Sequence, residues 1–597
     1  MKFLAFIKQV PEVSEISFDL EKKTLIRSGV KNGINPYDRR AISEAIRYKS
    51  EKAAEVIVAT MGPPQAREAL SEALLMGADR AIHIQDSRLA GSDTLVTARV
   101  LAAAARKIGF DILMCGLHST DSETGQVPPE LAELLGVPCA AAVRKIEYQG
   151  DQAVLAYCET DEGTTIVDLL LPAVISTAER LIKPIKMKGV DLSAAPSEKI
   201  EQWTIDDLQL SAGKVGLEAS PTRVADIYNQ RITRRPEIWD GSNAAETAKR
   251  ILEKLRTQYR KRDVPPVVPE RTLQGERQYW CWIEHDQGNI RPVSLEMLGS
   301  AALLAGTSGG TVSAIHAGPA LSPPAIELLS SCGADNIYSA SSNIIHPDDI
   351  VALLCAQIVD LKPYAFFMPA TSQGKYLAPR VAARLGLGLT GDCVGLQLDD
   401  QGRLVHLKPA FGGNFVAPIY CSTFPQFATI RPGALSLFRP RSGNPIPVVS
   451  WTFPYNVPHQ SRILSQESDS GMEAAKMESA KVVVCVGMGL GQQNVQLAFD
   501  LAELLQGAVG ATRRVVDAGW LPRQFQVGLT GKFIAPQCYL GLGVSGKYNH
   551  TIGIQKANTI LAINSDLQAD IFKTCDTGVI GDCAEITRQM IRTFEKE

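Results

Sequence analysis

The sequence contains no uninterrupted apolar run of about 18 residues, and this absence excludes an ordinary membrane-spanning helix. Residues 1–10 hold only a short apolar run between two lysines, so they predict a buried first strand and not a signal peptide. The formal net charge is only -3, which gives no electrostatic reason to bind nucleic acid or an anionic membrane surface. We therefore expect a cytoplasmic chain that binds no nucleic acid and does not itself span a membrane.

The sequence also lacks the common motifs for metals and for nucleotide hydrolysis. Its twelve cysteines form no Cys-x-x-Cys pair, and the closest two, Cys575 and Cys583, have no second pair to complete a metal site. Most cysteines lie in apolar stretches, which predicts buried reduced thiols and no bound metal. No Gly-x-x-x-x-Gly-Lys-Ser/Thr motif occurs, and this disfavours nucleotide hydrolysis.

Short apolar runs alternate with helical patterns through most of the chain. Residues 54–60 and 111–116 are typical of buried strands, and each is followed by a helical pattern. This rhythm predicts an α/β protein with parallel sheets covered by helices on both faces. A chain of 597 residues is too long for one hydrophobic core, so we expect three or four domains.

An ordered set of short motifs occurs twice. Gly-Ala-Asp at residues 77–79 is followed by Pro-Pro-Glu-Leu-Ala-Glu-Leu-Leu-Gly at 128–136. Gly-Ala-Asp recurs at residues 333–335 and is followed by Ala-Pro-Arg-Val-Ala-Ala-Arg-Leu-Gly at 378–386. The same order and similar spacing predict two copies of one α/β domain, packed as a pseudo-symmetric pair.

Two stretches have the composition of linkers. Residues 260–276 are charged and then proline-rich with no amphipathic period, and residues 451–478 are polar and then rich in Ser and Glu. We therefore expect domains at residues 1–259, 277–450 and 479–597, separated by these two linkers.

Three glycine-containing segments mark the C-terminal domain. An apolar run at residues 481–486 leads into Gly-Met-Gly-Leu-Gly at 487–491, which is an incomplete Gly-x-Gly-x-x-Gly because Gln492 occupies the last position. Gly-Ala-Thr-Arg follows at 510–513, and Gly-Leu-Gly-Val-Ser-Gly-Lys-Tyr-Asn-His at 541–550. Glycines between a strand and a helix let a phosphate approach the backbone amides, so these segments predict a nucleotide site.

The order and spacing of these segments, with residues 517–532 between them, resemble the FAD-binding domain of the electron transfer flavoprotein α subunit. Residues 278–447 resemble the first domain of the same subunit, and residues 1–259 resemble the β subunit. The resemblance implies two related doubly wound parallel-sheet domains, similar to adenine nucleotide α-hydrolases, plus a C-terminal Rossmann-like FAD-binding domain. The β-like part precedes the α-like part in one polypeptide.

The resemblance also implies which residues hold FAD. Arg513 and His550 correspond to residues beside the redox ring, where a fixed cation and a hydrogen-bonding imidazole stabilise the negative charge of reduced flavin. The family pattern has Arg at Met488 and Gln at Leu529, so those two contacts are lost here. The expected FAD-binding set is Gly487, Gly489, Thr512, Arg513, Gln526, Val527, Thr530, Gly531, Ser545, Gly546, His550, Asn564 and Asp576.

A second nucleotide is expected in the β-like domain, either AMP or a second FAD. The residues at the matching positions are Asn35, Met61, Asp121, Thr124, Gln126 and Val127. Members of the family that bifurcate electrons carry an Arg at a position that falls here on Tyr157 or Cys158. Its absence favours AMP or a non-bifurcating FAD.

The function implied is that of an electron carrier and not of a substrate-converting enzyme. It would accept electrons from a flavin dehydrogenase, as in fatty acid or amine oxidation, and pass them to a membrane-associated quinone oxidoreductase or an iron–sulfur protein. Lys188 and Gly189 replace the Leu-Pro that anchors the usual dehydrogenase in the family, so a different partner is expected. Two alternatives stay open: a bifurcating enzyme that oxidises NADH with two FADs, and an adenine-nucleotide sensor without flavin.

Overall fold

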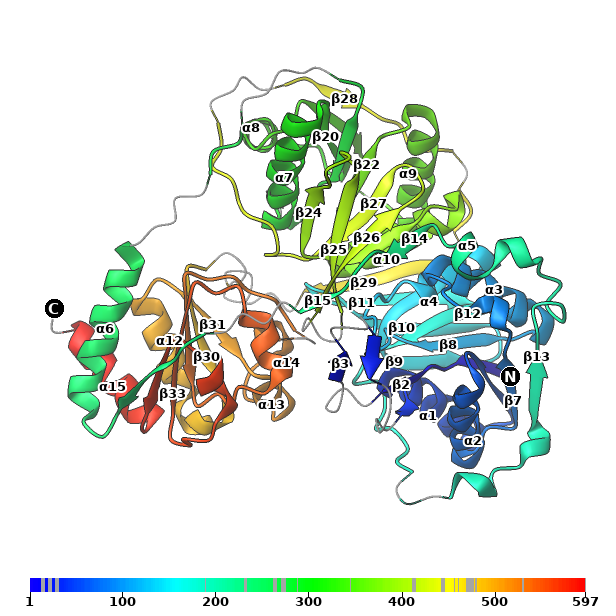
Figure 1. Cartoon of the computed structure of the whole chain (residues 1–597), viewed down its shortest axis with the longest axis horizontal. Helices are drawn as coiled ribbons and strands as arrows, with labels where there is room; N and C mark the ends of the chain where they lie inside the picture. The colour runs from blue at the N-terminus through cyan, green and yellow to red at the C-terminus, as the bar shows by residue number, and fades with distance from the viewer. Residues whose placement is uncertain are drawn as a thin grey trace. The chain divides into compact units, whose positions relative to one another are not determined.

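The chain, seen here in a computed structural model, divides into two compact units (Figure 1). The first unit comprises Met1–Asn229, Val268–Ile430 and Pro440–Glu467, and the second comprises Gln230–Val267, Arg431–Arg439 and Ser468–Glu597. The residues that the structure describes are 1–11, 17–19, 24–26, 32–187, 189, 191–229, 234–260, 266–269, 275–286, 288–343, 345–410, 415–441, 446–455, 457–459, 461–468, 477, 480–528 and 531–595.

The first sheet of the first unit is parallel at its centre and antiparallel at one side. Its order is β13-β7-β6-β1-β8-β12-β9-β10-β11-β29. The strands are β1 (Lys2–Phe6), β6 (Glu55–Met61), β7 (Arg80–Ile84), β8 (Ile112–Gly116), β9 (Cys139–Gln149), β10 (Ala153–Glu159), β11 (Gly163–Leu170), β12 (Ala173–Thr177), β13 (Ile200–Trp203) and β29 (Ser461–Ser468).

Helices cover both faces of this sheet. Side chains of α1 (Pro36–Glu51) and α2 (Arg67–Met76) pack in the core of one face, with Ile42 and Leu70 among them. Side chains of α3 (Thr94–Ile108) and α4 (Val127–Leu135) pack in the core of the other face, with Val96 and Leu131 among them. Because both faces are buried, the central strands are almost wholly apolar.

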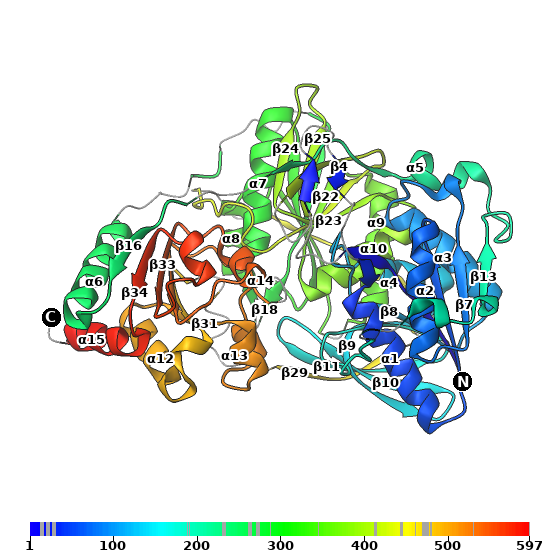
Figure 2. The same cartoon turned by 60° about the horizontal axis from the view of Figure 1, so that its bottom comes forward.

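The second sheet repeats the first. Its order is β28-β21-β20-β17-β22-β27-β23, with every pair parallel, so the equivalent strands follow the same spatial order as β13-β7-β6-β1-β8-β12-β9. Figure 2 shows two strands of this sheet, β22 and β23, with α9 and α10 nearby. The predicted internal repeat is therefore confirmed at the level of topology. The elements are β17 (Gln278–Trp282), α7 (Pro292–Ser308), β20 (Thr311–Gly318), α8 (Pro323–Ser331), β21 (Asn336–Ser341), α9 (Pro347–Leu361), β22 (Ala365–Pro369), α10 (Ser372–Leu385), β23 (Leu389–Cys393), β27 (Gln426–Ile430) and β28 (Val448–Ser450).

The two copies are joined by backbone pairing as well as by side chains. Two short strands that follow the first copy, β14 (Thr222–Val224) and β15 (Tyr228–Asn229), pair with β26 of the second copy. Together with β24 (Gly395–Leu398), β25 (Leu404–Ala410) and β26 (Phe415–Cys421), they form an antiparallel sheet. The smaller described elements of this unit are β2 (Gln9–Pro11) with β5 (Asn32–Ile34), β3 (Ser17–Asp19) with β4 (Thr24–Ile26), α5 (Gly216–Ala219), and β18 (His285–Asp286) with β19 (Asn289–Ile290).

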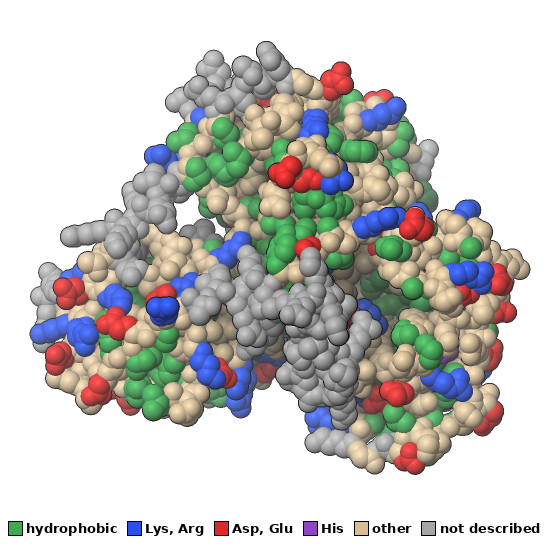
Figure 3. Space-filling model, viewed as in Figure 1, with side chains coloured by type: hydrophobic (Ala, Val, Ile, Leu, Met, Phe, Trp, Pro, Cys, Tyr) green, Lys and Arg blue, Asp and Glu red, His purple; other side chains and the backbone are tan. Residues whose placement is uncertain are grey.

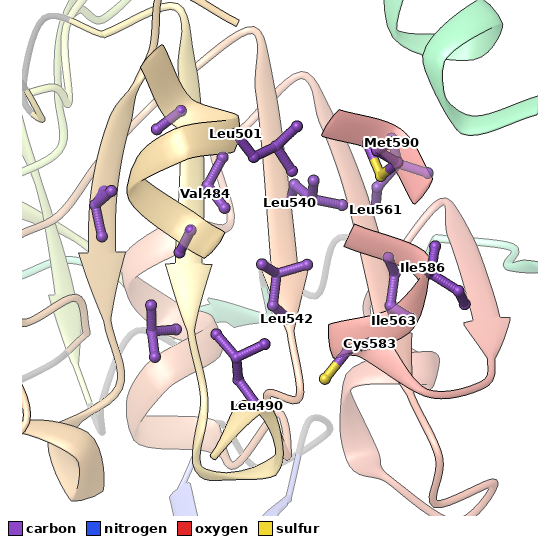
Figure 4. Close-up of a cluster of buried hydrophobic side chains, with 14 of the residues drawn as sticks. Val484, Leu490, Leu501, Leu540, Leu542, Leu561, Ile563, Cys583, Ile586 and Met590 are labelled. Carbon is purple, nitrogen blue, oxygen red and sulfur yellow. The ribbon is translucent and has the colours of Figure 1, made fainter. Parts of the chain in front are cut away.

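The second unit contains one parallel sheet in the order β16-β34-β33-β32-β30-β31, which confirms the predicted Rossmann-like C-terminal domain. Residues of α6, α12 and α15 pack against one face, around Leu501, Leu540 and Ile586 (Figure 4). The elements are β16 (Glu237–Asp240), α6 (Ala244–Arg260), β30 (Val482–Val486), α12 (Val495–Leu504), β31 (Ala508–Ala511), α13 (Arg513–Asp517), β32 (Cys538–Leu542), α14 (Tyr548–Thr551), β33 (Thr559–Asn564), β34 (Thr577–Ile580) and α15 (Cys583–Glu595).

Two segments belong to a different sheet from the one formed by the residues next to them in the chain. β16 and α6 belong to the second unit, where Glu237 N–H donates to the Asp576 carbonyl at 3.0 Å and β16 pairs with β34. Within the stretch predicted as the second linker, residues 461–468 form β29 at the edge of the first sheet. None of the twelve cysteines, all of which the structure describes, is in a disulfide, and all except Cys421 are buried.

A cluster of largely buried charges holds α4 against α10. Arg380 donates to Glu133 at 3.1 Å and to Asp348 at 2.7 Å, and Tyr376 donates to the Cys139 carbonyl at 3.2 Å. The side chains of Arg380 and Glu133 are each only 10% exposed. The guanidinium is therefore the partner of two carboxylates that water reaches poorly.

We expect Arg380→Ala to lower the free energy of unfolding of the first unit by about 3–5 kcal/mol, because it removes the cation that two poorly hydrated carboxylates share and leaves Glu133 only Arg384 and Asp348 only His346. Urea denaturation followed by circular dichroism measures this loss. Arg403→Ala is the control, since the Arg403–Asp399 pair is exposed on its arginine side and its removal should cost at most about 1 kcal/mol. Equal losses of unfolding free energy in the two variants would contradict the stabilising role of Arg380 between α4 and α10.

Candidate functional site

The sheet of the second unit changes its direction of winding at β30. β30 lies between β31 and β32. The chain continues from β30 to β31 on one side, and then crosses to β32 on the other side. In open parallel sheets, ligands bind outside the carboxyl ends of the strands at such a switch point. The residues that follow β30, β31 and β32 are therefore the candidate site.

The loops after β30 and β32 touch through their backbones. Gly487 N–H donates to the Leu542 carbonyl at 2.9 Å, and Gly489 N–H donates to the Gly543 carbonyl at 3.0 Å. A Cβ atom on Gly487 would lie 2.2 Å from the Gly543 oxygen, so only glycine fits there. These glycines allow the backbones of the two loops to come into contact. Contact of Gly487 and Gly489 with a phosphate stays a prediction, and the helix α12 begins only at Val495, after two short 3₁₀ turns.

Two adjacent amides are available at the end of β32. Within the described part of the chain, the N–H groups of Ser545 and Gly546 have no acceptor. Gly546 adopts φ +75°, and a Cβ atom there would lie 2.1 Å from the Ile571 nitrogen. Asn564, at the end of β33, donates to the Val544 carbonyl at 2.9 Å and so fixes the same loop. Free amide donors at a loop of this kind suit an anion.

The predicted residues after β31 lie beside this loop pair. Thr512 N–H donates to the Val486 carbonyl at 2.9 Å, which places Thr512 next to the end of β30. Gln526 pairs with Ala511, and Val527 N–H donates to the Ala511 carbonyl at 2.9 Å. Gly531 folds back on Gln526, since its Cβ position lies 2.2 Å from the Gln526 oxygen. The predicted residue Thr530 lies outside the described residues.

Arg513 is the first residue of α13 and is partly exposed. Its Nε donates to Asp517 at 3.2 Å, one turn further along the helix, and its side chain is 41% exposed. An exposed pair of this kind contributes little to stability. The guanidinium thus stands at the carboxyl edge of the sheet with one carboxylate beside it, and its predicted role beside a redox ring stays a prediction.

His550 is buried with both ring nitrogens engaged. Nδ1 lies 3.1 Å from the Val527 carbonyl, and Nε2 lies 2.7 Å from the Tyr539 hydroxyl. A carbonyl can only accept, so Nδ1 carries the proton and Nε2 accepts from Tyr539. Burial lowers the pKa of His550 to about 4 and raises that of Tyr539 well above its usual value. The predicted donation from His550 to a ligand would require one of these internal bonds to break, so this geometry does not supply it.

Asp576 is not brought together with the other predicted residues. It precedes β34, at the amino ends of the strands, where it accepts from Arg234 and from Ile560 N–H. One carboxylate at the carboxyl edge is Asp582, which follows β34 and caps α15 by accepting from Ala584 N–H at 2.8 Å. Gly581 N–H donates to the Asn564 carbonyl at 3.1 Å, which sets Asp582 beside Asn564. The sequence could have indicated Asp582, because it follows closely after β34, the last buried strand.

The first sheet of the first unit has its own switch point, between β1 and β8. Asp38 bridges the two strand ends by accepting from Lys8 N–H at 2.8 Å and Gly116 N–H at 2.9 Å. Burial raises the pKa of Asp38 to about 7. Asn35 donates to the His118 carbonyl at 2.9 Å and so holds the loop after β8. The predicted residue Met61 ends the adjacent strand β6.

The loop after β8 carries the other predicted residues. Asp121 Oδ2 lies 2.6 Å from Lys8 Nζ, whereas its Oδ1 is buried without a hydrogen-bond partner among the described residues. Burial opposes ionisation, but the Lys8 charge together with hydrogen bonds from Lys8, Ser119 and the Ser122 amide outweighs it and lowers the pKa of Asp121. Gln126 accepts from Thr94 at 2.7 Å and donates to the Leu389 carbonyl at 3.2 Å, so both ends of its side-chain amide already form hydrogen bonds within the protein. Thr124 lies two residues before it, with its carbonyl 3.6 Å from the Cβ position of Gly391.

The helix that follows this loop offers few donors. α4 begins at Val127 and continues with Pro128 and Pro129, which have no N–H. Of the first three helical residues, only Val127 can donate to an anion. A phosphate of the expected second nucleotide would therefore find one amide in this part of the helix, that of Val127, besides the loop before it.

We expect the His550 imidazole to stay neutral from pH 8 down to pH 5. Nuclear magnetic resonance of the histidine rings, assigned with His550→Gln, measures its titration, and a midpoint near 6.5 would contradict the assigned partners. Since the pKa in the folded state lies below the unfolded value, the unfolded chain binds more protons between pH 6.5 and 4, and stability falls as the pH falls through that window. The loss of unfolding free energy from pH 7 to 5 should be smaller in His550→Gln by about 2 kcal/mol.

The comparisons with known proteins agree with this architecture. The family described as the electron transfer flavoprotein domain matches residues 22–208 and 280–454, which are the two copies of the repeat. The family described as the electron transfer flavoprotein FAD-binding domain matches residues 476–555, which include the ends of β30, β31 and β32. No helix among the described residues is long and apolar enough to cross a membrane.

Individual relatives match the two parts separately. The electron transfer flavoprotein subunit beta of Thermoanaerobacterium thermosaccharolyticum is 37% identical over 261 residues, 43% of this chain and 99% of that protein. Its subunit alpha is 34% identical over 323 residues, 53% of this chain and 97% of that protein. Protein FixB of Rhizobium meliloti is 33% identical over 346 residues, 54% of this chain and 94% of that protein. This chain therefore belongs to the electron transfer flavoprotein family, with its β-like and α-like parts fused in one polypeptide.

Proposed function

We propose that this chain is an electron carrier that accepts electrons from a partner flavin dehydrogenase on an FAD and passes them to a quinone oxidoreductase or an iron–sulfur protein. The observation that carries the proposal is the switch point of the second unit. Free amides, a cation and buried polar side chains converge there, and the region matches the FAD-binding domain of the family.

The residues at this edge fit the parts of FAD. The amides of Ser545 and Gly546, which have no acceptor among the described residues, are donors of the kind that a diphosphate accepts from. Asn564 and Asp582 stand further along the same edge, where an adenosine half would lie, and Asp576 is not part of this proposal. When bound, FAD supplies the redox chemistry, and these side chains bind and orient it.

The second nucleotide is proposed for the switch point of the first sheet. The unpaired Oδ1 of Asp121 is a buried acceptor that suits a ribose hydroxyl or an amino group, and Lys8 lies next to it. Neither Tyr157 nor Cys158 supplies a cation at the position where bifurcating members carry Arg. We therefore favour AMP, or an FAD that does not bifurcate electrons, at this site.

The partner is proposed to differ from the usual dehydrogenases. Lys188, which stands where the family has part of its hydrophobic anchor, lies outside the described residues. Leu192 begins a short 3₁₀ turn nearby and is 38% exposed, so it is available as a substitute anchor. On the face in Figure 3, acidic and basic side chains are interspersed and do not gather by sign.

The nucleotide content of the purified protein tests the proposal most directly. Denaturation releases the nucleotides, and chromatography quantifies FAD and AMP per chain. We expect one FAD and one AMP. Two FADs would favour a bifurcating enzyme and call for titration with NADH, and a protein without flavin would overturn the proposed function in favour of a nucleotide sensor.

We expect Arg513→Ala to make reduction of the bound flavin less favourable, because it removes a cation close to the charge that reduction creates. The change should be on the order of 1 kcal/mol per electron for a partly exposed charge. A spectroelectrochemical titration measures the midpoint potential. Arg514→Ala is the matched control on the same helix, since Arg514 is exposed, and equal shifts in both variants would remove Arg513 from its role.

A further inference from the structure

A chain of side-chain hydrogen bonds crosses from the first copy of the repeat to the second. Glu130 Oε1, on α4, lies 3.2 Å from the hydroxyl oxygen of Thr94, the first residue of α3. The same hydroxyl oxygen lies 2.7 Å from Gln126 Oε1, and Gln126 Nε2 lies 3.2 Å from the Leu389 carbonyl of the second copy. Glu130 and Gln126 are both almost fully buried, so water does not compete for these contacts.

The donors of this chain can point in one direction only. The Leu389 carbonyl can only accept, so Gln126 turns its amide nitrogen toward it and its side-chain oxygen toward Thr94. That oxygen also can only accept, so Thr94 donates its single hydroxyl proton to Gln126. The contact between Thr94 and Glu130 then needs a proton from Glu130. The geometry thus places a proton on the Glu130 carboxyl group.

The surroundings of Glu130 favour the neutral acid. Its Oε2 is buried without a hydrogen-bond partner among the described residues. Burial raises the pKa of Glu130 to about 8, the Asp93 carboxylate adds to the rise, and the Arg99 guanidinium opposes it. Asp93 caps α3 by accepting from Val96 N–H at 3.0 Å. A moderate rise above neutral pH would therefore ionise Glu130 inside the protein.

The second copy carries a permanent charge at the equivalent position. Glu130 and Arg380 hold the same place in the two matching motifs, residues 128–136 and 378–386. Each contacts the first turn of the preceding helix, since Arg380 donates to Asp348 on α9 at 2.7 Å and Glu130 meets the first residue of α3. Arginine keeps its charge at every physiological pH, whereas a carboxyl group can lose its proton. At this position the first copy therefore has a group that responds to pH and the second copy does not.

The chain of hydrogen bonds passes through the loop of the proposed second-nucleotide site. Gln126 is the last residue of that loop before α4. In the part of the chain that the structure describes, the N–H groups of Gly125, Gln126 and Val127 have no acceptor. Gly125 has φ +65° and Gln126 has φ -84°, and successive amides at such a change of hand form a concavity that suits an anion. The side chain of Gln126 thus fixes the backbone donors that a nucleotide phosphate would use.

We propose that Glu130 is a proton-linked positioning residue of the second-nucleotide site, whose neutral carboxyl group holds Gln126 in place and whose ionisation weakens nucleotide binding. When the proton leaves, Thr94 turns its hydroxyl toward the carboxylate and Gln126 Oε1 loses its donor. The new buried charge also repels the phosphate of the nucleotide. This inference rests on the proposed second-nucleotide site and adds a control by pH to it.

The proton on Glu130 is tested on the full chain with its bound nucleotides. Infrared spectra of the native protein and of Glu130→Gln are compared between pH 6 and pH 10. We expect their difference at pH 7 to contain the carbonyl band of a protonated carboxylic acid, which disappears with a midpoint at about pH 8 or above. A difference spectrum that shows only a carboxylate at pH 7 would overturn the proposal.

The link to the nucleotide is tested with AMP, by calorimetry at pH 7 and pH 9 on the full chain that retains its FAD and has been dialysed free of AMP. We expect the native protein to bind AMP roughly tenfold more weakly at pH 9. Glu130→Gln should lose this difference, because a side-chain amide donates to Thr94 at either pH. Glu198→Gln removes an exposed carboxylate of the same domain and should keep the native pH dependence. The same pH dependence in Glu130→Gln as in the native protein would overturn the proposal.

Two variants of Thr94 separate the hydrogen-bonded chain from the effect of charge alone. Thr94→Ser keeps the hydroxyl and should keep the pH dependence. Thr94→Val breaks the chain and should bind AMP more weakly at pH 7, because Gln126 loses a hydrogen bond. Unchanged affinity in Thr94→Val would overturn the positioning role. A native protein that binds no AMP at either pH would overturn the second-nucleotide site itself, and the infrared spectra would still decide whether Glu130 carries the proton.

Discussion

Each of the three parallel sheets must reverse its direction of winding once, and the rest of the structure depends on this constraint. A chain that begins at the centre of a sheet fills one side and then crosses to the other, so two neighbouring strands send their connections apart. The gap falls between β1 and β8, between β17 and β22, and between β30 and β32. Residues with functional chemistry collect at these gaps because their backbone groups have no strand or helix to pair with.

The three gaps between neighbouring strands hold different groups. In the second unit, glycines let two loops touch, and the amides of Ser545 and Gly546 have no acceptor in the part of the chain that the structure describes. In the first copy of the repeat, a longer loop presents Asp121 beside Lys8. In the second copy, the gap is closed by Glu284, Arg291 and the incoming Asp161. One topology thus supplies an FAD-binding region by family membership, a proposed nucleotide site and a gap closed by the protein's own charged side chains.

Within each unit, strand pairing joins stretches from the β-like part and the α-like part of the fused polypeptide. β14 and β15 complete a sheet of the second copy, and β16 with α6 completes the second unit. Such additions bury apolar side chains such as Trp239 and Leu255 and satisfy backbone groups at sheet edges. The cofactor-binding unit is consequently assembled from three separate stretches of the chain.

The sequence by itself determined the α/β class, the repeat and the glycine-rich turns of the C-terminal domain, because hydrophobic period and turn chemistry act over a few residues. It also indicated Thr512, Ser545 and Asn564, which end or follow strands and therefore share one edge of the sheet, and Gln526, which pairs with the last residue of β31. Only the tertiary structure decided that Asp576 lies at the opposite edge, that Tyr539 and Val527 occupy both nitrogens of His550, and that Asp161 reaches α10. These outcomes depend on contacts between residues far apart in the chain, and no local pattern carries that information.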